Sequence, residues 1–194
     1  MPQITRESLM TLEAYAKARS EFRAQVMAHK KNRVVAVGEH ITLIFEDELT
    51  VRYQIQEMLR VEKTFEEAGI NDELDTYNPL VPDGTNWKAT MMIEYTDPAM
   101  RVAALKRLRG IEDRVYVHVE GCDRVYAIAD EDLERETEEK TSSVHFLRFE
   151  LTRDMVQSAK HGAVIRMGVD HPAYTVTTSA LPSSIRDSLA ADLA

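Results

Sequence analysis

The sequence predicts a mixed α+β fold with a largely antiparallel sheet of about eight strands. Segments with alternating apolar residues, typical of strands, are joined by short turns that suit hairpins. The regular strand–helix–strand alternation of a parallel sheet does not occur. Other segments have apolar residues at helical spacing, and we expect these helices to pack mainly on one side of the sheet.

Caps and stop signals delimit the expected helices. Asp47, Asp97 and Thr152 each precede a helical pattern and can accept a hydrogen bond from its first turn. Pro98 at a first helical position and Gly162 after a last one support two boundaries. In chain order, the expected helices cover residues 6–15, 20–32, 48–63, 64–69, 71–78, 97–109, 152–161 and 184–193.

The expected strands are separated by turn residues. Gly38 begins a two-residue hairpin turn, and Gly121 begins a second hairpin turn further along the chain. A long loop is expected over residues 77–87, which contain Pro79 and Pro82. In chain order, the expected strands cover residues 33–37, 40–46, 88–95, 114–120, 124–129, 143–151, 163–168 and 174–180.

Composition excludes several classes of protein. The 194 residues carry a net charge of −9, which is unfavourable for binding nucleic acid or an anionic membrane. Apolar runs are far shorter than the roughly 20 residues of a membrane helix, and the N-terminus lacks a secretory pattern. The lone Cys122 rules out multi-cysteine metal centres within the chain. We expect a cytoplasmic protein with a single α+β domain over residues 1–181 and a C-terminal amphipathic helix or tail over 182–194.

Several long blocks carry a family resemblance. They read FED at 45–47, QIQEMLR at 54–60, YNPLVPDG at 77–84, AT and IE within 89–94, and KTSSVHFLRFEL at 140–151. They resemble the uncharacterised bacterial family known as domain of unknown function 3501. The resemblance spans about residues 5–174, and the tail after Pro182 lies outside it. It implies no activity, but members of this family tend to be encoded near rubrerythrin-like and iron–sulfur oxidoreductase-like proteins.

Two classes of function remain open, and no sequence motif identifies a reaction. The first hypothesis is a cytoplasmic accessory or interaction protein in a redox or peroxide-stress pathway, with rubrerythrin-like or iron–sulfur partners. This role follows from the family context and from the lack of a catalytic signature. The second hypothesis is a protein, with or without catalytic activity, that binds a transition metal or a small ligand through a His/Glu site.

His145 is the most informative residue for the second hypothesis. Strand alternation places it on one face with Leu147 and Phe149, so we expect a buried imidazole. One interpretation is a core histidine with a single hydrogen-bond partner. The other is a metal ligand or proton-transfer group, with the carboxylate of Glu57 as its partner.

Three further ligand-binding candidates accompany this pair. Arg60 lies one helical turn after Glu57, and the two side chains either form a solvated ion pair or contribute to a site. Asn78 and Asp83 lie in the loop 77–87, which is either a structural corner or a binding loop.

Two remaining segments concern the surface. Residues 130–139 contain seven carboxylates and one arginine, which indicates a solvated acidic loop or short helix. The C-terminal stripe of Ile185, Leu189 and Leu193 needs an apolar surface to cover it. Either its own domain or a second copy can supply that surface, and we favour a homodimer.

Overall fold

The structure, a computed structural model, describes residues 3–194 and confirms the mixed α+β class. In this range nine strands form two antiparallel sheets. The strands are β1 (Val34–Ala36), β2 (Ile41–Phe45), β3 (Asn86–Ile93), β4 (Val115–Val119), β5 (Val125–Tyr126), β6 (Ile128–Ala129), β7 (Val144–Glu150), β8 (Ile165–His171) and β9 (Tyr174–Thr177). The sheet orders are β1-β2-β3-β7-β6 and β5-β4-β8-β9.

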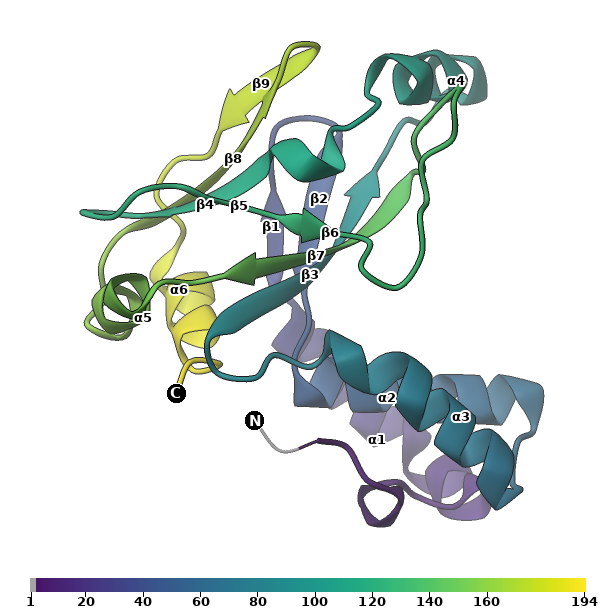
Figure 1. Cartoon of the computed structure of the whole chain (residues 1–194). Coiled ribbons are helices and arrows are strands. Elements are labelled where there is room, and N and C mark those ends of the chain that lie inside the picture. The colour runs from purple at the N-terminus through teal and green to yellow at the C-terminus, as the bar shows by residue number, and fades with distance from the viewer. Residues whose placement is uncertain (1–2) are drawn as a thin grey trace.

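The helices lie in separate places around the two sheets (Figure 1). The α-helices are α1 (Leu12–Lys30), α2 (Glu48–Glu62), α3 (Glu67–Tyr77), α4 (Pro98–Arg107), α5 (Arg153–Lys160) and α6 (Ser183–Ala190). Short 3₁₀ turns are η1 (Arg6–Ser8), η2 (Asn78–Leu80) and η3 (Glu112–Arg114). No helix in residues 3–194 has the length and apolar character needed to cross a membrane.

The helices differ from the prediction in two regions of the chain. The expected helices over 6–15 and 20–32 are replaced by η1 and one continuous helix, α1. Thr11 caps α1 by accepting a hydrogen bond from the Ala14 backbone N–H, and no proline or glycine interrupts it afterwards. Similarly, α3 runs without a break through Gly69, because packing of Ile70 and Leu74 outweighs the helix cost of one glycine.

The expected single sheet is divided in two at Ala127. The predicted strand 124–129 becomes β5, which pairs with β4, and β6, which pairs with β7 in the other sheet. Between them the buried Ala127 donates its backbone N–H to the carbonyl of Val115. This crossing lets one short segment contribute an edge strand to each sheet.

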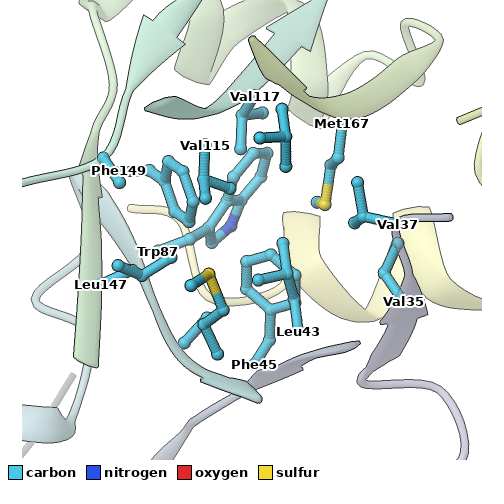
Figure 2. Packing of buried hydrophobic residues seen from close by; sticks show 14 of the residues in the cluster. Val35, Val37, Leu43, Phe45, Trp87, Val115, Val117, Leu147, Phe149 and Met167 are labelled. Atoms are coloured by element: carbon cyan, nitrogen blue, oxygen red, sulfur yellow. The ribbon is translucent and has the colours of Figure 1, made fainter. Parts of the chain in front are cut away.

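The main core lies between the two sheets, as Figure 2 shows. Trp87 from β3 is fully buried, with Val115 and Val117 of the four-stranded sheet on one side and Phe45 of its own sheet on the other. Its indole Nε1–H donates to the carbonyl of Leu189 at 2.8 Å. The tryptophan therefore links both sheets to the C-terminal helix.

The C-terminal helix α6 forms as expected and joins this core. Leu189 and Leu193 are buried in it, and Ile185 packs against it. Arg33 is 1% exposed and makes a bidentate ion pair with Asp192, at 2.5 and 3.1 Å. The apolar stripe is therefore covered by the chain's own core, without a second copy, and the homodimer stays a prediction.

Helices α1, α2 and α3 gather at one end of the five-stranded sheet (Figure 1). They have their own apolar contacts, in which α2 packs against both α1 and α3. Residues of α2 and α3 lie beside residues of β2, β3 and β7 on the face of the five-stranded sheet that points away from the main core. The two surfaces leave a cleft between them.

Candidate functional site

His145 is fully buried near one end of β7, as its position beside Leu147 and Phe149 predicts. Its Nδ1 lies 2.6 Å from Oδ2 of Asp130, the residue that follows β6. Its Nε2 lies 2.9 Å from the hydroxyl oxygen of Thr141 and 3.1 Å from the carbonyl oxygen of Ser142. A second carboxylate oxygen, Oε2 of Glu112 in η3, is 3.8 Å from Nε2.

The two carboxylates beside His145 have different environments. Asp130 also accepts hydrogen bonds from the backbone N–H of Phe146 and from Arg135, so both of its oxygens have donors. Glu112 is 7% exposed, and burial raises the pKa of its carboxyl. Its oxygen Oε2 accepts a hydrogen bond from the Thr141 hydroxyl at 3.2 Å.

Glu57, the carboxylate expected beside His145, lies elsewhere. It is on α2, where Arg19 binds both of its oxygens at 2.7 and 2.9 Å and Tyr15 donates a hydroxyl at 2.7 Å. The Arg19 guanidinium lowers the pKa of the Glu57 carboxyl to about 2. Arg60 completes this group by pairing with Glu57 at 3.2 Å. Glu57 therefore joins α2 to α1, and Arg60 belongs to the same ion-pair network, which does not include His145.

The two loop candidates also have local structural roles. The side-chain amide of Asn78 accepts the backbone N–H of Ile4 and donates to its carbonyl, both at 2.9 Å, which anchors the N-terminal segment. Asp83 accepts hydrogen bonds from Thr85 and Asn86 and so shapes the turn before β3. Neither side chain meets His145.

A helix–sheet cleft forms where the loop 77–87 begins. It consists of two hollows of about 570 and 300 Å³ that share the lining residues Tyr77, Leu80 and Phe146. Strand pairing explains the sheet wall: Thr90 lies opposite Phe146, and Lys88 opposite Arg148, so all four point to the outer face. These volumes fall within or near the roughly 300–1,000 Å³ range of small-molecule sites.

The larger hollow has a wall made by residues 131–135, within the acidic segment. Leu133 is exposed there, and the Arg135 guanidinium stacks over the Phe146 ring at 4.6 Å. Arg135 also pairs with Asp132 at 2.6 Å, and Arg148 pairs with Glu131 at 2.8 Å. Residues 131–135 of the acidic segment thus form one wall of the hollow, and both arginines already pair with carboxylates.

Lys88 differs from these arginines. Its side chain is partly buried on the cleft floor, and its ammonium donates one hydrogen bond, at 2.6 Å, to the carbonyl of Pro79. No carboxylate within residues 3–194 forms an ion pair with it. Burial lowers the pKa of Lys88. An ammonium has three N–H donors, so this cation retains donors for a ligand.

Comparisons with other proteins place the chain in a family. The model of the family described as "Protein of unknown function (DUF3501)" matches residues 3–193. The chain belongs to this family. A crystal structure of a "novel protein of unknown function" from Burkholderia pseudomallei K96243 is similar over 100% of both chains, with 56% identity and a TM-score of 0.94. The search of curated proteins returned no match.

The family match corrects one expectation from the sequence. The DUF3501 match runs through residue 193, so the tail after Pro182 is part of the family and not outside it. The buried contacts of Leu189 and Asp192 give the physical reason, because α6 completes the main core.

Sequence reasoning missed Glu112, Asp130 and Lys88 as members of a site. In the sequence, Asp130 is one of seven carboxylates in the acidic segment 130–139, and nothing distinguishes it from the others. Glu112 is distant from His145 in the sequence. Lys88 carries one signal that could have found it. It alternates with the apolar residues of a strand that directly follows the candidate loop, which places it on the outer face beside that loop.

Proposed function

We propose that this DUF3501 protein binds a small organic anion with an apolar body in the helix–sheet cleft. Lys88 carries the proposal, because it is a partly buried cation that forms no ion pair within the described part of the chain, has a single carbonyl as its hydrogen-bond acceptor, and lies beside the apolar side chains of Leu80 and Phe146. The anionic group of the ligand would contact Lys88. Its apolar body would lie against Leu80, Leu133 and Phe146.

Energetics favour an anion over a neutral ligand. Partial burial of the Lys88 side chain removes part of the hydration of its ammonium, which disfavours the charged form unless a counter-charge is near. A carboxylate or sulfonate beside Lys88 restores that interaction through a charge-assisted hydrogen bond. Three carboxylates line the larger hollow. Glu131 and Asp132 already pair with arginines, and Asp75 is exposed to solvent, so Lys88 is the charged group there that gains most from a ligand.

The test uses 1-anilinonaphthalene-8-sulfonate, an aromatic sulfonate whose fluorescence rises in apolar sites. Lys88→Met keeps the length of the side chain and removes its charge. Loss of one charge-assisted hydrogen bond, about 1.5 kcal/mol, raises the dissociation constant roughly tenfold.

Lys106→Met is the matched control, because it makes the same change on the exposed surface of α4. We expect it to leave the dissociation constant unchanged. Equal affinities for the two variants, with circular dichroism showing both folded, would contradict the assignment of Lys88.

The cytoplasmic accessory role beside a rubrerythrin-like or iron–sulfur protein stays a prediction from the family resemblance. The corresponding measurement is copurification of the native, untagged protein under reducing conditions. Recovery of such a partner would support the role, and repeated failure would count against it. Light scattering of the pure protein tests the homodimer, and a monomer at micromolar concentration would contradict it.

A further inference from the structure

The buried ring of His145 faces an unusual set of atoms. Around Nε2 lie the Thr141 hydroxyl at 2.9 Å, the Ser142 carbonyl at 3.1 Å and the Glu112 carboxylate at 3.8 Å. With Glu112 ionised, only the hydroxyl among these groups carries a proton, and it donates that proton to Oε2 of Glu112 at 3.2 Å. The side of the ring that faces Nε2 is therefore rich in negative charge and lone pairs.

The opposite ring nitrogen determines how Nε2 is used. Nδ1 lies 2.6 Å from a carboxylate oxygen of Asp130, so it carries a proton and donates it. In the neutral ring Nε2 then has a free lone pair directed toward the oxygens. A carboxylate that fixes the ring from behind in this way is the usual support of a metal-binding histidine.

The buried carboxyl of Glu112 also favours a cation at this point, because a cation beside it would stabilise its charged form. Glu112 is buried, and no lysine or arginine in residues 3–194 forms an ion pair with it. A proton on Nε2 could be donated to the nearby Ser142 carbonyl. It could not be donated to Glu112, because the 3.8 Å between Nε2 and Oε2 is too long for a hydrogen bond. A small cation held between these atoms could contact all of them.

We propose that Nε2 of His145, Oε2 of Glu112, the Ser142 carbonyl and the Thr141 hydroxyl bind a divalent first-row transition metal. Asp130 is a positioning residue that orients the ring. The four ligand atoms are separated by 2.9–3.8 Å in the contacts described. Ligands about 2.0–2.2 Å from one ion have spacings of this size.

The donor set indicates the class of metal. One imidazole and one carboxylate with neutral oxygens suit Zn²⁺, Fe²⁺ or Mn²⁺, whereas the absence of thiolate from the set disfavours Cu⁺. The site is separate from the helix–sheet cleft. His145 and Phe146 are consecutive on β7 and point to opposite faces, so only Phe146 reaches the cleft.

The first experiment measures metal content of full-length, untagged protein after chelation and titration with Zn²⁺ or Mn²⁺. We expect one ion per chain by elemental mass spectrometry after dialysis. Glu112→Gln and His145→Gln should abolish this binding, and Asp130→Asn should weaken it about tenfold. His40→Gln is the matched control, because this histidine lies outside the cluster and stacks on Tyr95.

A second measurement needs no variant, so it holds even if the buried substitutions unfold the chain. Bound Mn²⁺ should broaden amide signals of the wild-type protein around residues 112, 130 and 141–145. Broadening centred on the exposed carboxylates of 131–139 would overturn the proposal. So would the absence of binding at millimolar metal with a doubly protonated His145 ring, because a proton would then fill the role of the ion. Anilinonaphthalene sulfonate binding is unaffected by either result, so the two proposals fail independently.

Discussion

Asp130→Asn is the substitution that most sharply tests how the cleft wall is held. Asp130 binds His145 at 2.6 Å, Arg135 at 3.1 Å and the Phe146 backbone N–H at 2.9 Å. It lies at φ +50, in the left-handed region. Asparagine tolerates this conformation as well as aspartate does, so the substitution removes charge without adding backbone strain.

The expected cost follows from those contacts. The amide oxygen can still accept the Phe146 N–H, but one charged acceptor for His145 and Arg135 is lost. Hydrogen bonds to charged groups contribute about 1.5–3 kcal/mol each, and Arg135 retains its pairing with Asp132. We therefore expect a loss of about 2–3 kcal/mol in the free energy of unfolding, or about 4–12 °C in melting temperature for a chain of this size.

Urea denaturation measures the free energy, and amide hydrogen exchange locates the effect. Exchange should accelerate in residues 130–136, which form the cleft wall, and remain slow around Trp87. Asp132→Asn is the control, because its side chain is 53% exposed and has no contact with His145. A stability change for Asp130→Asn no larger than that of the control would refute this account of the wall.

Two further predictions concern the ion pairs that hold the helices. The folded pKa of Glu57 is depressed to about 2, so its stabilisation is complete above the unfolded pKa of about 4.5 and is lost as pH falls toward 2. Glu57→Gln should thus destabilise the protein at neutral pH but much less at about pH 3, and an equal loss in urea denaturation at both values would contradict this. Asp192→Asn removes the charge of the carboxylate that binds both terminal nitrogens of buried Arg33, while Asp47 remains 3.5 Å from it, and should cost about 1.5–3 kcal/mol. Limited proteolysis should then cut first near α6, and an unchanged cleavage pattern would show that this ion pair does not hold the helix.

Local signals in the sequence explain most of the fold. Capping by Asp47, Asp97 and Thr152 occurs as predicted, because each side chain accepts a backbone N–H of the first helical turn. The division into two sheets was not predictable from alternation alone. The division occurs at Ala127, where the chain passes from β5 in one sheet to β6 in the other. Each of these strands has only two residues, so its place depends on the strand it pairs with and not on its own sequence pattern.

The candidate site was likewise predictable only in part. Alternation along β7 correctly predicts that His145 is buried. Its partners could not be predicted, since Glu112 and Asp130 reach it through tertiary packing of η3 and the end of β6. Glu57 was an attractive partner in the sequence, but Arg19 and Tyr15 on α1 occupy its oxygens, and helical spacing within α2 does not reveal a neighbour on another helix.

The central claim is that the helix–sheet cleft binds small organic anions, and a ligand titration followed by ¹H–¹⁵N spectra of the wild-type protein tests it most directly. We expect anilinonaphthalene sulfonate to shift the amide signals of Tyr77, Leu80, Lys88, Leu133 and Phe146 together, with one saturating curve. Shifts that do not saturate, or that gather on other surfaces such as the hollow beside His40 and Tyr95, would contradict the claim.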